Sequence, residues 1–507
     1  MNHQSTISTV LPTLRGRLSV DDLAKKPSLF VQFITKERSN RMYGAFAFLA
    51  ITIQFTLFKI LYPFPDFLPE SYNYIDTASQ HLAVNVWPVG YGKFIWLIHC
   101  ISISDTFLIG IQYLLLEAAL AYLFFTVLYL YKSARMVRNI LFAFLFINPL
   151  FLYLSNCILP DALFASLSIV FLVQFCWMFH RPAPSQFILQ GVIAGLAFTI
   201  SFAAVFYPLV CLGGVLLLKK RPKLAPSGWI IGTVLIVGFL LISMQKTKEA
   251  TGTAQLSVLG SWQLANNALY MYGHTKMDST RMPKETRTLD RTTRDFFEDI
   301  PAAQRDVAGF AGAFFLVVPY SPLKVFMDRQ FRDEDAPKQF EAWAKVAPLY
   351  AAYGKALIRQ RPVSYVTYFV GPNIKNYFLP PLEKFEMYNL NRSDVPTTVQ
   401  EWFGYMTPDI AVVSATFQAR LFYPYRYFFL ALNVFFWGGL IWWMVAGRVR
   451  KMKPEFRNAF LLTSAFLVLH LVLSVIAAPV VLRCQVVPMI LLVTFCLFLS
   501  HPKTVYA

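Results

Sequence analysis

The sequence predicts an all-α polytopic membrane protein with about ten transmembrane helices. Three observations support this class. Of the 507 residues, 56% are hydrophobic and only 15% are charged, whereas roughly 25% of the residues in an average soluble protein are charged. Mean hydropathy is +0.48. Several apolar runs also reach the roughly 20 residues that a helix needs to cross the hydrocarbon core of a bilayer.

The predicted spans follow one another along the chain with two long interruptions. They are 43–62, 105–131, 139–156, 160–179, 186–202, 204–218, 228–246, 423–446, 459–478 and 485–501. The pair within 186–218 is separated only by the polar Ser201 and by Pro208, which disfavours a continuous helix. One long broken helix is the alternative, and it would reverse the orientation of every later span.

Loop charge sets the expected orientation. The net charge of +18 is best explained by basic cytoplasmic loops, because no basic run alternates with exposed aromatics as in a nucleic-acid-binding domain. The loops "KSARMVR", "KKRPK" and "GRVRKMKPEFR" are strongly basic, whereas "SNCILPD" and "AAPVVLR" are nearly free of Lys and Arg. Ten spans place every basic loop and both termini in the cytoplasm. We therefore expect a multi-pass plasma membrane protein, in a bacterium the inner membrane, with membrane lipids and no nucleic acid as partners.

This topology divides the chain into four parts. They are a basic cytoplasmic segment 1–42, a transmembrane core 43–246, a surface domain 247–422 and the C-terminal transmembrane helices 423–507. The first apolar segment is too long and too far from the start for a signal peptide, so we expect it to remain as a span. The part 247–422 is too long for a plain loop and should form a mainly helical extracytoplasmic domain before the last three spans. Its polar middle, "TKMDSTRMPKETRTLDRTTRDFFEDIPAAQRD", should be exposed or mobile.

The first extracytoplasmic loop, 63–104, concentrates acids at the membrane surface. The stretch "PFPDFLPESYNYIDTASQ" contains Asp66, Glu70 and Asp76, and "NVWPVGYGKFIWLIHCISI" follows it. The two stretches predict two short interfacial helices. Such helices would roof a membrane cavity with a carboxylate beneath them.

Several motifs carry a resemblance to a known family. A long span, an acid soon after its end, "ESYNYIDTA" and "WPVGYGKFIWLIH" together resemble the integral-membrane glycosyltransferases of the GT-C fold. This family includes the protein O-mannosyltransferases, the aminoarabinose transferases of lipid A and many bacterial relatives. The stretches "NPLFLYLSNCILPDALFASLSIV", "ALIRQRPVSYVTYF" and "APVVLRCQVVPMILL" are similar to elements before and within the family's later spans.

The resemblance implies transfer of a sugar from a polyprenyl phosphate to a lipid, glycan or protein acceptor, with inversion, on the extracytoplasmic face. A first-loop carboxylate would be the general base. By motif position this acid is Glu70, although most relatives have Asp there, so Asp66 and Asp76 remain alternatives. All three could instead be solvated or cap helices. An acid in a partly desolvated site can have its pKa raised towards the range useful for a base.

Further residues are candidates for substrate binding. Asp161 either caps the helix that it opens or binds acceptor or metal. Arg483 either binds the donor phosphate or is a structural Arg that snorkels or pairs with an acid. Lys355 and Arg359 could form a second phosphate-binding cluster or lie on a solvated helix face. Tyr74, Asp76 and Tyr91 are the candidates for lining the substrate pocket.

No obligatory cofactor is expected, although a divalent metal is possible. The first loop lacks a DxD-like pair, and no second His there has metal-binding spacing. The six Cys have no CxxC spacing and are interpreted as buried small hydrophobic residues.

The sequence is compatible with three further functions. A transporter or flippase of lipid-linked sugars should have ionisable residues at mid-span depth and symmetric broken helices, whereas these spans are nearly free of charge. A membrane glycan polymerase or ligase would use similar lipid-linked donors on a different fold. A non-catalytic membrane scaffold is the third, since Glu70 stands where most transferases of the family have Asp.

Overall fold

The computed structural model describes residues 29–131, 133–218, 222–301, 305, 313–331 and 339–501. Within these ranges every named element is helical, and the only β pairing consists of two isolated bridges. Most of the predicted N-terminal segment, residues 1–28, lies outside the described residues. The chain divides into an N-terminal unit and a second unit that begins at Ala50.

The N-terminal unit contains α2 (Leu29–Lys36) and the first part of α3 (Arg38–Leu61). Asn40 links the two helices, because its side-chain amide donates to the Phe33 carbonyl oxygen at 3.0 Å and to the Glu37 carboxylate at 3.1 Å. The junction between these helices is therefore held by side-chain hydrogen bonds.

In the described part of the chain, eight helices are long and apolar enough to cross a membrane, which confirms a helical polytopic membrane protein. They are α3, α6 (Asp105–Leu130), α7 with α8 (Arg135–Phe146, Pro149–Asn156), α9 (Asp161–His180), α12 (Ser227–Thr251), α21 (Phe417–Val445), α22 (Pro454–Ala477) and η10 with α23 (Leu482–Gln485, Val486–Leu499). All eight coincide with predicted spans.

Two shorter apolar helices correspond to the remaining predicted spans. They are α10 (Pro184–Ile200) and the pair η1 (Phe202–Phe206) and α11 (Tyr207–Leu217). The chain breaks at Ser201, whose backbone is extended and whose hydroxyl accepts the Ala203 N–H. The number of helices that cross the bilayer stays a prediction.

Helix α6 runs from one end of the helix bundle to the other. At its start, Asp105 accepts a hydrogen bond of 2.5 Å from the Tyr405 hydroxyl. Beyond its end, the Tyr131 ring packs edge-on against His180 and Phe456, each at 5.3 Å between ring centroids. The basic residues around α7 and before α22 therefore lie at the Tyr131 end. The acidic first loop lies at the opposite end, and the positive-inside rule predicts that the Tyr131 end is cytoplasmic.

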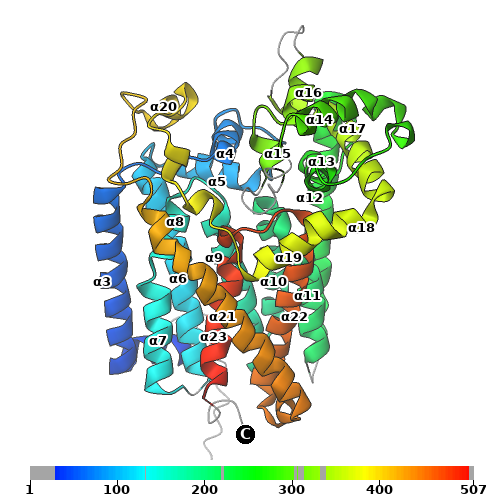
Figure 1. Ribbon diagram of the computed structural model, residues 1–507. Coiled ribbons are helices and arrows are strands. Elements are labelled where there is room, and N and C mark those ends of the chain that lie inside the picture. Colours follow the sequence, from blue (N-terminus) through cyan, green and yellow to red (C-terminus); the bar gives the residue numbers. More distant parts are fainter. Residues whose placement is uncertain are drawn as a thin grey trace, which may run out of the picture. The chain divides into compact units, whose positions relative to one another are not determined.

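The end that carries the first loop is covered by helices, as Figure 1 shows. The loop itself forms α4 (Pro69–Ser79) and α5 (Gly90–His99). The later covering helices are α13 (Val258–Tyr272), α14 (Arg287–Glu298), α15 (Phe314–Val317), α16 (Pro322–Gln330), α17 (Gln339–Gln360), α18 (Pro362–Tyr365), the π-helical η6 (Val366–Val370), α19 (Gly371–Phe378) and α20 (Thr397–Phe403). The long stretch before the last spans is therefore largely helical where it is described.

Helices α13 and α17 form the core of this covering region. The rings of Trp262 and Trp343 stack at 3.9 Å, and the Trp262 indole N–H donates to the Trp343 carbonyl oxygen at 2.9 Å. The helices approach closely because Gly354 packs directly on the α13 backbone, where an added Cβ would lie 2.8 Å from Leu264. This core is apolar and aromatic.

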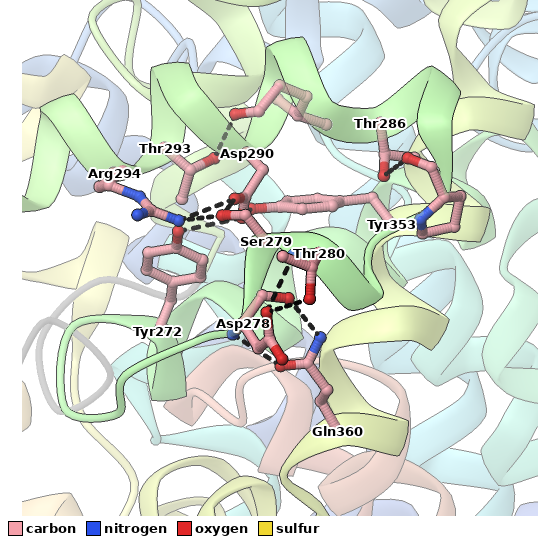
Figure 2. A network of polar contacts seen from close by, with 12 residues as sticks. Tyr272, Asp278, Ser279, Thr280, Thr286, Asp290, Thr293, Arg294, Tyr353 and Gln360 are labelled. Atoms are coloured by element: carbon pink, nitrogen blue, oxygen red, sulfur yellow. Dashed lines mark hydrogen bonds and ion pairs between the residues drawn. The ribbon is translucent and has the colours of Figure 1, made fainter.

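A polar network stabilises the segment that was expected to be exposed or mobile (Figure 2). Asp290 of α14 is 1% exposed and accepts hydrogen bonds from Tyr272 at 3.0 Å, Tyr353 at 3.1 Å and Ser279 at 2.6 Å. Arg294 pairs with it at 3.2 Å. The prediction of an exposed segment is therefore wrong for this face of α14, because one buried carboxylate accepts hydrogen bonds from three parts of the chain.

Candidate functional site

The first loop is attached to the junction between α8 and α9 before α4 begins. The Asp66 backbone N–H donates to the Asn156 carbonyl oxygen at 3.0 Å, and Ile158 donates back to Asp66 at 3.3 Å. Helix α4 then starts at Pro69, which suits the first helical turn. The Ser71 hydroxyl accepts the Leu68 N–H at 3.0 Å. These bonds place Asp66 just ahead of α4, next to the α8–α9 junction.

Two glycines let α5 approach its neighbours. An added Cβ at Gly90 would lie 2.4 Å from the carbonyl oxygen of Thr199 at the end of α10, and one at Gly92 would lie 2.6 Å from Thr77 of α4. The motif "VGYGK" thus packs α5 between α4 and α10. Tyr91, between the glycines, is fully buried.

A cluster of five ionisable side chains lies at this end of the bundle, and we call it the charge cluster. Its members are Glu70 of α4, Asp161 at the start of α9, Glu383, Lys384 and Arg483 of η10. Lys384 donates to both carboxylate oxygens of Glu70. Arg483 contacts Asp161 at 3.0 Å, Glu383 at 3.4 Å and Glu70 at 3.9 Å. The structure thus brings three predicted residues together across more than 400 positions of sequence.

Arg483 is paired with acids in this arrangement. Its three carboxylate neighbours, with only Lys384 as a second cation, leave the charge cluster with one more negative than positive group. Mutual pairing compensates for removing these charges from water. The contacts of Arg483 therefore match the alternative of a structural Arg that pairs with acids. Phosphate binding by Arg483 stays a prediction. The Asp161 carboxylate takes part in this pairing from the first turn of α9, and no side-chain cap bond forms there.

Asp66 borders the charge cluster and is itself 3% exposed. Its carboxylate accepts the Asn389 backbone N–H at 2.8 Å. Burial raises the pKa of Asp66 to about 7, although the Asn389 N–H and the nearby Lys384 charge both act to lower it. Asp66 is thus a carboxyl group that titrates near neutral pH.

Glu70 has the opposite electrostatic character. Burial favours its protonated form, but the charges of Lys384 and Arg483 outweigh burial and hold the pKa of Glu70 below its usual value. Glu70 is consequently an ionised partner of Lys384 at neutral pH. The two first-loop acids therefore differ in protonation because only one of them is paired with a cation.

The segment that supplies Glu383 and Lys384 has a strained backbone. Glu383 has φ of 53°, and Asn389, Leu390 and Asn391 have φ of 49°, 51° and 60°. Each such conformation costs about 1–3 kcal/mol for a residue with a side chain and persists only where its surroundings enforce it. Here the Glu383–Arg483 pair and the Asn389–Asp66 hydrogen bond hold the segment.

Sequence reasoning did not find this segment. It reads "PPLEKFEMYNLN", and neither its acids nor its Lys follow a helical or strand period. The asparagines at its end were the available signal, since Asn tolerates left-handed backbone better than most residues. Local reasoning could not connect them to a first loop more than 300 positions earlier.

Several buried polar atoms around the charge cluster have no protein partner in the described part of the chain. They are Asn156 Oδ1, Asn389 Oδ1, Gln418 Oε1 and both amide atoms of Gln485. Gln418 donates to the Lys384 carbonyl oxygen at 3.3 Å, and Gln485 follows Arg483 by two positions. Because buried polar groups are normally hydrogen-bonded, such atoms indicate a place where water or a ligand binds.

The remaining predicted residues lie in different places. Tyr74 and Tyr91 are buried edge to face at 5.0 Å, and Tyr91 donates to Gln112. Burial raises the pKa of both tyrosines well above the usual value, so both are neutral. Lys355 and Arg359 lie on α17, and neither forms an ion pair with the charge cluster within the described ranges. They fit the alternative of a solvated helix face.

A metal site was not expected to be obligatory. Where the chain is described, no group of three or more His, Cys, Asp and Glu side chains is arranged to hold a metal ion. In the charge cluster the acids surround the Arg483 guanidinium and the Lys384 ammonium. Metal dependence of the protein stays a prediction.

Fold and site together define a helical polytopic membrane protein with a buried charged site at one end of its bundle. Comparison with protein-family models, with curated proteins and with solved structures found no match.

Proposed function

We propose that this protein is a membrane glycosyltransferase that moves a sugar from a polyprenyl-phosphate donor to an acceptor on the extracytoplasmic face, with inversion. One observation carries the proposal. Asp66 is a buried carboxyl group with a pKa of about 7, near the paired cation Lys384, at the end of the bundle that carries the acidic loop. A general base works best when its pKa lies near the working pH.

The pKa directions favour Asp66 over Glu70 as the base. A carboxylate whose pKa is lowered by Lys384 holds protons weakly, and it suits an electrostatic anchor better. In the proposed step the Asp66 carboxylate accepts the proton of the acceptor hydroxyl or amine. The acceptor atom bonds to the anomeric carbon as the carbon–oxygen bond to phosphate breaks. The phosphate oxygen keeps the electron pair and leaves as polyprenyl phosphate.

The leaving phosphate needs cationic partners, and the charge cluster offers two. The Arg483 side chain is 21% exposed, against 9% for Lys384, so it is the more accessible of the two. Its contacts with Glu383 and Glu70, at 3.4 Å and 3.9 Å, are longer than its contact with Asp161. Exchange of these looser contacts for a bidentate phosphate contact would use the planar guanidinium. This supports Arg483 as the donor-binding cation.

The test measures sugar transfer by purified protein in nanodiscs, with labelled lipid-linked sugars and acceptors from membranes of the native organism. We expect Asp66→Asn to lower transfer at least about a hundredfold, the low end for general-base catalysis. Glu70→Gln should lower transfer less than Asp66→Asn does. Full transfer by both variants would refute the proposed base, and release of free polyprenyl phosphate by the wild type alone would support it.

A flippase of lipid-linked sugars is a second candidate, and Glu117 favours it. The spans are not entirely free of charge, because Glu117 lies midway along α6 and is 3% exposed. Its Oε2 atom has no partner in the part of the chain that the structure describes. Ionisable residues at this depth commonly belong to transport pathways. Movement of labelled lipid-linked sugar between leaflets without transfer, abolished in Glu117→Gln, would support the flippase. Elongation of a glycan chain would indicate a polymerase or ligase. If the protein shows no transfer, no transport and no elongation, a non-catalytic scaffold is the remaining function.

A further inference from the structure

A cleft of about 300 Å³ lies beside α4, away from the charge cluster. Helix α4 lines it with Asn73 and Asp76, and Gln80 lines it directly after the end of α4. Their spacing of three and four residues places them on one face of the helix. Glu70 and Tyr74 lie on another face, where they meet the charge cluster and the buried tyrosine pair. A single short helix therefore separates a buried charged site from an open cleft, whose lining also includes the apolar Leu82, Val84 and Ala250.

The opposite wall of the cleft comes from the start of α17. Gln339, Phe340 and Glu341 line it there. The carboxylates of Asp76 and Glu341 form no ion pair, and no Lys or Arg lines the cleft, within the described ranges. Side-chain amides donate and accept hydrogen bonds, carboxylates accept them, and an aromatic ring offers an apolar stacking face. This combination suits a ligand that is rich in hydroxyl groups, and the two carboxylates disfavour an anionic one.

We propose that this cleft binds a saccharide portion of the acceptor that carries no acidic group. The saccharide's role as acceptor rests on the proposed transferase function. Asp66 lies ahead of the first residue of α4, whereas α4 lines the cleft only from Asn73 onward. A ligand in the cleft therefore cannot also react at Asp66 unless it extends along α4. The acceptor is therefore an elongated glycan or glycolipid, held in the cleft by sugar units remote from the group that is modified.

The first experiment tests binding directly. Full-length protein in nanodiscs is applied to an array of neutral, amine-bearing and acidic glycans. The variants are Asp76→Asn with Glu341→Gln, which removes both acids, and Ala83→Trp, which fills the cleft from an exposed loop position. Asp295→Asn with Glu298→Gln, at exposed acids of α14, is the matched control.

We expect the wild type and the control pair to bind glycans without carboxylate, sulfate or phosphate groups. Both cleft variants should bind them roughly tenfold or more weakly, because hydrogen bonds to charged acceptors are lost or blocked. The proposal is overturned if the wild type binds no glycan, prefers acidic glycans, or binds no more tightly than Ala83→Trp. If the double variant Asp76→Asn with Glu341→Gln does not fold, Ala83→Trp still tests whether the cleft binds the glycan.

A second measurement separates this proposal from the proposed function. Asp66→Asn should lower transfer at least about a hundredfold but leave glycan binding unchanged, whereas the cleft variants should raise the KM for acceptor and keep kcat. If the wild type binds neutral glycans but transfers no sugar, the cleft proposal stands and the transferase fails. If it transfers sugar but the cleft variants leave the acceptor KM unchanged, the cleft proposal alone fails.

Discussion

Asp66→Asn should make the protein more stable at alkaline pH while it removes the proposed base. The folded carboxyl group has a pKa of about 7, against a usual value of 3.8. Between these values the folded state keeps a proton that the unfolded chain has released. The stabilisation that comes from this bound proton is therefore fully present below pH 3.8, and it is lost as the pH rises towards about 7. Asn keeps the oxygen that accepts the Asn389 N–H, and it cannot ionise.

The size of the effect follows from the gap in pKa. At about 1.36 kcal/mol for each pKa unit, a gap of about three units corresponds to roughly 4 kcal/mol as an upper limit. The variant should thus match the wild type near about pH 4 and exceed its stability by up to this amount above about pH 7. An increase in unfolding temperature of several degrees is expected on the alkaline side.

The measurement is the apparent unfolding temperature of purified protein in nanodiscs, scanned at one fixed rate because membrane proteins often unfold irreversibly. Asp295→Asn, at an exposed acid of α14, is the control and should follow the wild type at every pH. The reasoning is wrong if Asp66→Asn is less stable than the wild type at about pH 8, or if the difference between them does not change with pH.

Three further predictions concern packing and pairing. Lys384→Met should destabilise the protein by about 3–5 kcal/mol, because it leaves the buried Glu70 carboxylate without its Lys partner. In thermal unfolding, the double variant with Glu70→Gln should recover much of the lost unfolding temperature. Gly90→Ala should cost about 1–3 kcal/mol, because its Cβ would lie 2.4 Å from a backbone oxygen of α10; Gly238→Ala, with nothing within 4 Å, should have no such cost. Asp290→Asn should cost about 1–3 kcal/mol and increase amide exchange in α14, with transfer activity unchanged; unaltered exchange would contradict a stabilising role for this network.

Much of the helical architecture was predictable from the sequence. Apolar runs of sufficient length are local properties, and all of the predicted spans are helical, although the span predicted at 139–156 is divided into α7 and α8. The break at Ser201 was equally local, since a polar residue and the nearby Pro208 mark it. The first-loop acids were also visible, because carboxylates are costly near a hydrocarbon core and therefore stand out.

The tertiary structure decided how these acids differ. Asp66 and Glu70 lie four positions apart in one loop, and only the folded chain pairs Glu70 with Lys384 and leaves Asp66 with a backbone N–H. The pairing joins residues more than 300 positions apart, through a segment with strained backbone and no periodic pattern. Hydrophobic length alone determined the membrane class of this protein. Which carboxylate keeps a proton depends on desolvation and neighbouring charge, and both arise only when distant segments pack together.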